Sequence, residues 1–553
     1  MTTSRLTAFA RNMMTVGIVG VVISQLLGCS NTEPKKNFTG QPVRGGTLIF
    51  ATEREPTCLD PHSQGDMPQV FIAQQFLDSL VSMDDQGNIH PWLAKGWDVS
   101  KDGLVYTFHL RDDVHFTDGT PFNANAVKAN LDHMVNPKTQ SGTAGSYIAQ
   151  YVRTEIVDNN TAKVYLSKPY AAFLEVLAQG FLGMESPKAL QRSLEENCQN
   201  PVGSGPFKVV RWDRQSQIVL ERNPDYAWAP PTAKHQGAAY LDKIIWKIMP
   251  EASVRFGALQ AGEVDVIDAL PPESHAPARA NPNITLLLKD RPGNPTKGDF
   301  NLTRPPFNDI RVREAFVRAS NVEGALKSIY FGEYQRAGGP LSPVTPFYNA
   351  EFEHDKDYNP ARANLLLDQA GWTARDQDGY RLKDGKRLTI DVPIQERMGN
   401  AERALWEQIQ ASTKKVGFAV ELNPISTSAQ TKCCGTGWDY DIRIGYWNTN
   451  TPDVLRIIFS SEFNNRPGQS YHTNGTGFRH TEFDQIINAA LQTQDVEKRR
   501  DLYVQAQRII SKNYLQLTTI AQSSRLAIYK TAKGVRLEPS LTIPYFYDAW
   551  VEK

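Results

Sequence analysis

The sequence has few cysteines, no excess of charge of either sign and no apolar run long enough to cross a bilayer. The 553 residues include 60 lysines and arginines together and 60 aspartates and glutamates together. The net charge is therefore close to zero, and no overall positive potential would attract nucleic acid. The longest apolar run, Val16 to Leu27, is shorter than the ~20 residues of a spanning helix. Composition therefore excludes a nucleic-acid binder and a multispanning membrane protein, and we expect the mature chain to be soluble.

Signatures of catalysis are also absent. The sequence contains no G-x-S-x-G elbow, no H-E-x-x-H helix, no Walker A loop and no G-x-G-x-x-G after a strand. The stretch Gly379 to Lys386 ends in Gly-Lys at the wrong spacing, and it predicts a hairpin turn at Lys383-Asp384-Gly385. We therefore expect a protein without enzymatic activity and without a cofactor.

The N-terminal segment has the pattern of a lipoprotein signal. Arg5 and Arg11 form a positive region, the apolar run follows, and Gly28 precedes Cys29. We predict cleavage before Cys29 and lipidation of its thiol, and an uncleaved anchor or an ordinary signal is the alternative. The working part would then lie in the periplasm or at the cell surface, lipid-anchored to a membrane. The polar composition of the next stretch predicts a flexible tether, which gives a signal peptide at 1–28 and a tether at 29–44.

Four further cysteines are Cys58, Cys198, Cys433 and Cys434. An exported chain meets an oxidising space, and four cysteines allow three pairings. We favour a bridge from Cys58 to Cys198, and a bridge between the adjacent cysteines is the strained choice. Free thiols and bridges between the two pairs are the alternatives, and the spacing offers no tetrahedral zinc site.

Strand and helix patterns alternate along the rest of the chain, which indicates a mixed α/β protein. Clear helix starts are Asn123, Asp309 and Asn359-Pro360, each a capping residue before an apolar-periodic segment. We predict strands at 46–53, 104–110, 162–166, 207–211, 218–221 and 244–248, and helices at 124–134, 253–261, 361–370, 482–489 and 496–511.

Several spaced motifs together resemble the solute-binding proteins, family 5, of ABC importers, which serve oligopeptides, dipeptides, glutathione, nickel and metallophores. The resemblance covers the mature chain in order. Its motifs include Leu59-Asp-Pro-His62, Pro91-Trp-Leu-Ala-Lys-Gly-Trp97, Val114-His-Phe-Thr-Asp-Gly-Thr-Pro-Phe122, Asn200-Pro-Val-Gly-Ser-Gly-Pro-Phe207 and Pro306-Phe-Asn-Asp-Ile-Arg-Val-Arg-Glu-Ala315.

The resemblance implies a two-lobed periplasmic-binding-protein-like clamp. Lobe I would comprise 45–288 and 515–553, with an extra subdomain inserted at about 94–199, and lobe II would comprise 289–514. Crossovers near Asp290-Arg291 and near Thr519 would form the hinge. A ligand that touches both lobes would favour the closed state.

The resemblance also suggests which residues bind the ligand. The stretch after the first strand would line the cleft, which makes Glu53, Arg54 and His62 candidates. A second stretch, Gly445 to Asp453, resembles the segment in which relatives place an aromatic residue on the ligand and an aspartate on a peptide amine. Its candidates are Tyr446, Trp447, Asn448 and Asp453, and the aspartate position itself falls on Asn448 or Thr449.

The position of the arginine that pairs with a peptide carboxylate in relatives falls on Glu396, with Arg397 next to it. These departures disfavour a plain dipeptide.

We predict the extracytoplasmic solute-binding component of an ABC importer, a monomer that delivers a peptide or peptide-like solute to permease subunits. The alternatives are a binder of nickel or of an opine-type metal chelate in the same importer class and, less favoured, a periplasmic sensor or chaperone-like binder. We expect no metal site within the protein itself.

Overall fold

A computed structural model describes residues 40–354, 356–396, 398–464 and 472–552. The chain divides into two units, Met1–Gln41 and Pro42–Lys553, and the fold below is that of the second unit. The predicted signal peptide, Cys29 and Arg397 lie outside the described residues. No helix within the described ranges has the length and apolarity that crossing a membrane demands.

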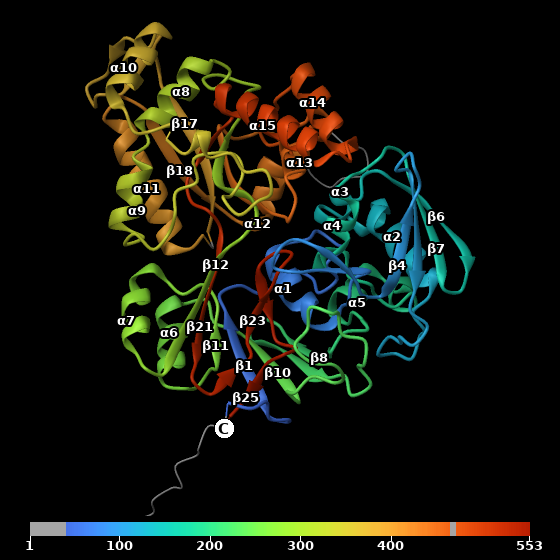
Figure 1. The fold of residues 1–553 in the computed structure, drawn as a ribbon. Helices are drawn as coiled ribbons and strands as arrows, with labels where there is room; N and C mark the ends of the chain where they lie inside the picture. Colours follow the sequence, from blue (N-terminus) through green and yellow to red (C-terminus); the bar gives the residue numbers. More distant parts are fainter. Residues whose placement is uncertain (1–39, 355, 397, 465–471, 553) are drawn as a thin grey trace, which may run out of the picture. The chain divides into compact units, whose positions relative to one another are not determined.

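A seven-stranded mixed sheet, called here the β1 sheet, has the order β12-β21-β11-β1-β10-β9-β8 (Figure 1). β1 pairs in parallel with β10 and β11, and the remaining pairs are antiparallel. Its strands are β1 (Thr47–Thr52), β8 (Phe207–Asp213), β9 (Gln217–Arg222), β10 (Lys243–Ile248), β11 (Val266–Ile267), β12 (Ile284–Asp290) and β21 (Ser523–Tyr529).

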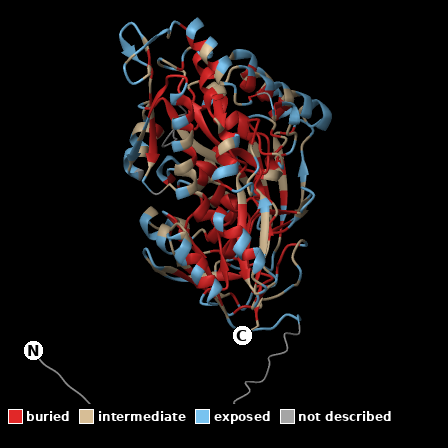
Figure 2. Ribbon diagram, turned by 90° about the vertical axis from the view of Figure 1, so that its left-hand side faces the viewer, coloured by how far each residue is buried: buried red, intermediate tan, exposed pale blue. Residues whose placement is uncertain are grey.

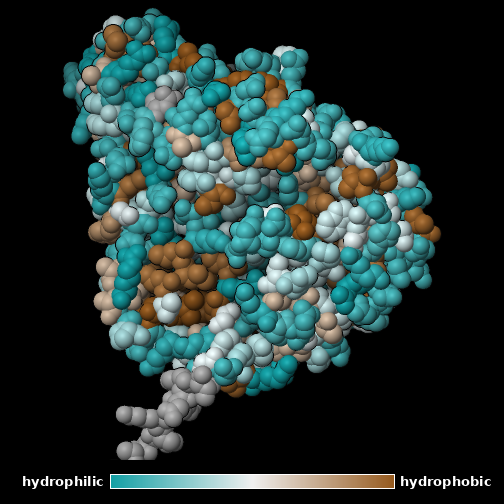
Figure 3. Space-filling model, in the orientation of Figure 1, coloured by the Kyte–Doolittle hydropathy of each residue, from teal (hydrophilic) through white to brown (hydrophobic). Residues whose placement is uncertain are grey.

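One face of the β1 sheet packs on helices from the same part of the chain. α6 (Ala252–Gln260) and α7 (His275–Ala280) form a small apolar cluster with it. Half-buried apolar side chains border this cluster, and Figure 3 shows a hydrophobic area over β21, β11 and β1. α1 (Met67–Phe76) is buried along its whole length and belongs to the larger core.

A separate four-stranded antiparallel sheet, β4-β5-β7-β6, is inserted between β1 and β8. Its strands are β4 (Ala94–Val99), β5 (Val105–Leu110), β6 (Tyr151–Asp158) and β7 (Thr161–Leu166). The accompanying helices are α2 (Ala124–Val135), α3 (Thr143–Tyr147), α4 (Phe173–Leu177) and α5 (Leu194–Gln199). These elements lie within residues 94–199.

A second group of elements surrounds a three-stranded sheet, called here the β13 sheet, in which β13 (Gly293–Phe300) lies between β19 (Ile442–Asn448) and β20 (Gln516–Thr518). Beside it lie the parallel strands β17 (Thr389–Gln395) and β18 (Ala419–Ile425). A separate apolar core holds these strands and the first four helices of the group, whereas the buried apolar side chains of its last three helices belong to the larger core. The helices of this group are α8 (Ile310–Ala319), α9 (Val322–Ser328), α10 (Pro360–Gln369), α11 (Asn400–Lys414), α12 (Thr427–Gln430), α13 (Val454–Phe459), α14 (Thr481–Gln492) and α15 (Val496–Lys512).

Short strand pairs complete the fold. They are β2 (Val81–Met83) with β3 (Ile89–Pro91), the hairpin group β14 (Ala374–Arg375), β15 (Arg381–Lys383) and β16 (Lys386–Arg387), β22 (Ala532–Lys533) with β25 (Trp550–Val551), and β23 (Arg536–Glu538) with β24 (Ile543–Tyr545). The predicted turn at Lys383-Asp384-Gly385 is confirmed, since β15 and β16 pair across it. In Figure 2 the buried residues concentrate along the strands, and the outer helices expose one side.

Two crossing segments connect the β1 sheet with the β13 sheet. Between β12 and β13 only Arg291 and Pro292 intervene, and residues 519–522 lie between β20 and β21. The segments are hydrogen-bonded to each other, because the Arg291 amide donates to the Gln522 carbonyl at 2.7 Å and the Thr519 amide donates to the Thr296 carbonyl at 2.8 Å. The crossovers predicted from the resemblance lay near Asp290-Arg291 and near Thr519.

Candidate functional site

Arg54 and Tyr446 join the two groups of elements. Arg54 follows the end of β1, Tyr446 lies on β19, and the Arg54 guanidinium Nη2 donates to the Tyr446 hydroxyl at 3.4 Å. Glu53 Oε1 lies 3.7 Å from Arg54 Nε. Burial alone would lower the pKa of Arg54, but Tyr446 and Glu53 raise it above its ordinary value. Two predicted cleft residues from distant parts of the sequence thus meet here.

Glu402 adds a second acidic group to this junction. It lies in the first turn of α11, where the positive end of the helix dipole favours an acid. Burial raises the pKa of Glu402 to about 7, while Arg54 lowers it and Glu53 raises it further. We call Glu53, Arg54, Glu402 and Tyr446 the Arg54 junction: one fixed positive charge with two carboxylates and a hydroxyl.

Trp447 and Asn448 contact the inserted subdomain. The Trp447 indole Nε1 donates to the Tyr147 hydroxyl at 2.9 Å, and that hydroxyl donates to the Asn448 carbonyl at 2.8 Å. The Tyr147 and Trp447 rings meet edge to face, with 6.4 Å between centroids. Next along the chain, the Gln179 side-chain amide donates to Thr449 Oγ1 and Asn450 Oδ1. The segment that begins at Tyr446 therefore runs along the meeting surface.

Asp453 is fully buried, and its carboxylate is engaged within the protein. Both oxygens accept from the Arg456 guanidinium, at 2.9 and 2.7 Å, and one also accepts from the Tyr170 hydroxyl at 3.1 Å. To bind a ligand, as predicted, the Asp453 carboxylate would have to replace some of these hydrogen bonds with bonds to the ligand. Through its bonds to Arg456 and Tyr170, Asp453 connects the start of α13 with the inserted subdomain.

Among the described residues, neither Glu396 nor His62 makes a hydrogen bond or ion pair with the Arg54 junction. Glu396 is exposed at the end of β17, with its amide bonded to the Ile425 carbonyl. His62 is fully buried, and its ring Nε2 lies 2.8 Å from the Gly183 carbonyl. Burial lowers the pKa of His62 to about 4, against the opposing effect of Asp60.

A cavity of about 200 Å³ lies where several segments of both groups meet. Its lining includes Glu175, Phe347, Asn450 and Arg499. Burial raises the pKa of Glu175 to about 7, while Arg499, whose guanidinium lies 3.7 Å away, lowers it. The cavity is smaller than the ~300–1,000 Å³ of most small-molecule sites, so a peptide-sized ligand requires the surrounding segments to separate.

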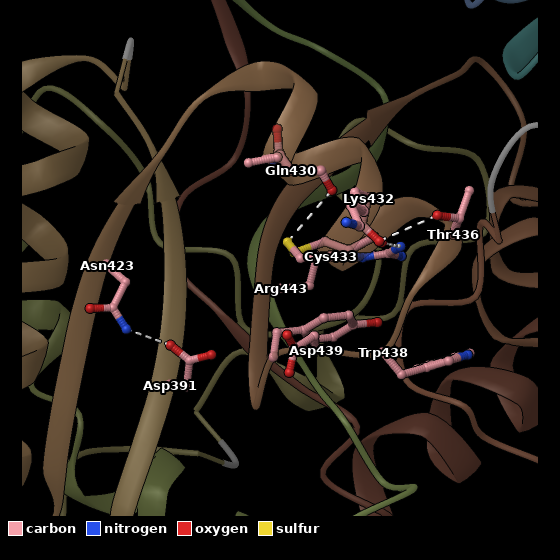
Figure 4. The surroundings of a disulfide bond; sticks show 12 residues. Asp391, Asn423, Gln430, Lys432, Cys433, Thr436, Trp438, Asp439 and Arg443 are labelled. Carbon is pink, nitrogen blue, oxygen red and sulfur yellow. Dashed lines mark hydrogen bonds between the residues drawn. A yellow bond between two sulfur atoms is a disulfide. The ribbon is translucent and has the colours of Figure 1, made fainter.

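Two disulfides join cysteines within the described residues. Cys58–Cys198 is the bridge favoured from the sequence, and it ties the loop after β1 to α5. The second joins the adjacent Cys433 and Cys434, the pairing regarded above as the strained choice. The chain accommodates it in a wide turn, Thr431–Thr436, with π-helical hydrogen bonding. Figure 4 shows Cys433 with its sulfur toward the Gln430 carbonyl.

Sequence reasoning missed Glu402, Tyr147 and Gln179. Each has a role only because distant segments approach each other: Glu402 interacts electrostatically with Arg54 and Glu53, and the inserted subdomain is hydrogen-bonded to residues 447–450. An acidic residue at a helix start is common for capping reasons alone. No local pattern in the sequence distinguished these three residues.

Comparison with solved structures identifies the class of fold. The periplasmic binding protein DppA of Helicobacter pylori, in complex with the peptide STSA, matches with a TM-score of 0.80 and 25% identity, over 93% of this chain and 99% of DppA. The oligopeptide-binding protein AppA of Bacillus subtilis, in complex with a nonapeptide, matches with a TM-score of 0.82 and 23% identity, over 93% and 100% of the two chains. The chain has the mixed α/β fold of the periplasmic binding proteins.

The family follows from the sequence comparisons. The model of the bacterial extracellular solute-binding proteins, family 5, matches residues 88–466, and the chain belongs to this family. The glutathione-binding protein GsiB of Salmonella typhi is 28% identical over 500 residues, which are 89% of this chain and 92% of the relative. The expectations of family, fold and transport role are confirmed: the chain is the solute-binding component of an ABC importer and not an enzyme.

Proposed function

We propose that the chain captures a peptide or a peptide-like compound of the glutathione type outside the cytoplasm and delivers it to its permease. The observation that carries this proposal is the Arg54 junction, where a fixed cation and two carboxylates lie between the two groups of elements. A peptide-like ligand is a zwitterion. Its carboxylate would pair with Arg54, and its ammonium with Glu53 or Glu402, through charge-assisted hydrogen bonds.

The two groups act, in this proposal, as lobes I and II with the predicted boundaries. The crossing segments are short and lie side by side, so small dihedral changes in both would rotate one lobe on the other. Ligand contacts on both sides favour the closed arrangement, which supplies the signal that the permease recognises. Trp447 and Asn448 would form the aromatic and amide side of the same cleft.

Isothermal titration calorimetry of ligand-stripped protein tests the proposal. We expect saturable binding of glutathione or a short peptide, with an about 10–100-fold weaker affinity in Arg54→Gln, because a hydrogen bond to a charged group contributes about 1.5–3 kcal/mol. Arg153→Gln is the matched control, an arginine on β6 that stacks on Tyr165 in the inserted sheet.

The titrations separate the alternatives. If a nickel–histidine complex binds and peptides do not, the metal-chelate alternative replaces the proposal. If peptides bind equally well to wild type and Arg54→Gln, the function stands but the assigned site is wrong.

We also propose that Cys29 carries a lipid that holds the receptor beside its permease. The support is the signal pattern before Cys29, together with membership of an extracellular family. Metabolic labelling with a fatty-acid analogue should label wild type and leave Cys29→Ser unlabelled; equal labelling of both would contradict the anchor.

A further inference from the structure

A second site lies between the loop after β1 and helix α2. It is formed by Asp60, His62 and His133, whose ligand atoms all lie within 4.8 Å of one another. The side chains of Asp60 and His62 are fully buried, and that of His133 is 16% exposed. None of the three belongs to the Arg54 junction.

The His62 ring presents a lone pair to a carboxylate. Its Nε2 lies 2.8 Å from the Gly183 carbonyl, which can only accept, so Nε2 carries the hydrogen. In the neutral ring Nδ1 is then an acceptor; it has no hydrogen-bond partner and lies 3.7 Å from Asp60 Oδ1. Two acceptors facing each other in a buried space are unfavourable unless a cation lies between them.

His133 can present a second lone pair to the same carboxylate. Its Nε2 lies 3.0 Å from Asp60 Oδ2. The Thr139 hydroxyl donates to the His133 carbonyl at 2.7 Å, and its oxygen lies 3.3 Å from His133 Nδ1. Nδ1 can therefore donate to Thr139, which leaves Nε2 free to bind a cation.

A second buried acidic side chain, Glu185, lies close to Asp60. The Asn197 amide donates to Asp60 Oδ2 at 3.2 Å and to Glu185 Oε2 at 2.9 Å. Glu185 Oε1 is buried without a hydrogen-bond partner. Among the described residues, neither carboxylate has an ion pair with lysine or arginine. Buried acids in this arrangement are costly without a positive partner.

We propose that Asp60, His62 and His133 bind one divalent transition-metal ion, with Zn²⁺ the best match. Two imidazoles with carboxylate oxygens are a typical zinc donor set. Tetrahedral bonds of about 2.0–2.2 Å place ligand atoms roughly 3.3–3.6 Å apart, and the distances of 3.0 and 3.7 Å to Asp60 bracket this range.

The ion would brace the first lobe. Beside the cluster, Cys58 is bridged to Cys198, and the Thr143 amide at the start of α3 donates to the Gln64 carbonyl. The same helix ends at Tyr147, the partner of Trp447. A metal at Asp60 would thus fix the loop after β1 relative to α2 and α3.

Zinc titration of the EDTA-treated full chain tests the proposal. We expect one Zn²⁺ per chain, a higher unfolding temperature with zinc, and Co²⁺ absorption of the tetrahedral type. His133→Asn should bind zinc at least about 100-fold more weakly, because loss of an outer-shell partner alone costs 10–100-fold. His109→Asn is the matched control, an exposed histidine on β5 with Nε2 2.8 Å from Asp98 Oδ2.

X-ray absorption on zinc-loaded wild type provides a readout that needs no variant, and two imidazoles in the first shell are expected. Zinc binding that is absent from wild type, or equal in wild type and His133→Asn, would overturn the proposal. Zinc binding that persists in Arg54→Gln is expected, since the solute site is separate.

Discussion

At the scale of single residues, Asp78 links protonation to stability. It is fully buried, and its carboxylate accepts hydrogen bonds from the Ser204 hydroxyl, the Trp228 indole and the Tyr226 hydroxyl. Burial raises the pKa of Asp78 to about 7, and the three donors oppose this rise. The pKa of Asp78 is higher in the folded than in the unfolded protein, so the folded state favours the protonated side chain. The contribution of Asp78 to the free energy of unfolding is therefore fully present below about pH 4 and is lost as the pH rises to about 7.

We expect Asp78→Asn to remove this part of the pH dependence. An amide oxygen can accept from Ser204 and Trp228, and the amide nitrogen can donate to the Tyr226 oxygen. The free energy of unfolding of wild type, relative to the variant, should fall between pH 4 and 7 by at most about 1.4 kcal/mol per pH unit. Urea unfolding measures this difference, with Asp112→Asn, an exposed carboxylate, as control. A constant difference across the range would contradict the assignment.

At the scale of elements, the Cys58–Cys198 bridge ties the loop after β1 to α5 across 140 residues of sequence. Closing so long a loop restricts the unfolded chain, so Cys58→Ala with Cys198→Ala should lower the free energy of unfolding by about 2–5 kcal/mol. Denaturant unfolding in the presence of EDTA measures this loss without a contribution from bound metal.

The second disulfide supplies the control for this experiment. Cys433 and Cys434 are neighbours in the sequence, so their bridge closes almost no loop. The double variant Cys433→Ser with Cys434→Ser should therefore lower the free energy of unfolding by less than the Cys58–Cys198 double variant does. If both double variants lose the same free energy of unfolding, restriction of the unfolded chain does not explain the stabilisation by the Cys58–Cys198 bridge.

Elements with a local signature were predictable from the sequence. Asn123, Asp309 and Asn359 cap α2, α8 and α10 as expected, because capping is a property of neighbouring residues. α1 was missed because all ten of its residues are buried, so it has no apolar stripe. β13 was missed as well: its sequence, GNPTKGDF, is polar although every residue is buried.

The candidate site was predictable only in part, for a related reason. The resemblance indicated Arg54 and Tyr446 separately, but their hydrogen bond depends on how β1 and β19 are placed in space. Glu402 and Tyr147 became visible only through such contacts. His62, expected in the cleft, is buried beside Asp60, because burial is decided by packing of the inserted subdomain and not by the motif.

At the scale of the whole molecule, the crossing segments predict a rotation of one lobe on the other. Small-angle scattering of the stripped protein should show a smaller radius of gyration on saturation with the ligand found by calorimetry, since the ligand binds the closed state more tightly. Arg54→Gln at the same ligand concentration should remain largely open. Identical scattering of wild type with and without saturating ligand would contradict closure.

The strand order of the β1 sheet has a consequence for how the receptor is made. β12 is attached to the sheet only through β21, a strand from the last 31 residues of the chain. Until that strand is synthesised, β11 and β12 each lack a neighbour, and residues that emerge first cannot complete their sheet. This arrangement delays the finished sheet until almost the entire chain is available.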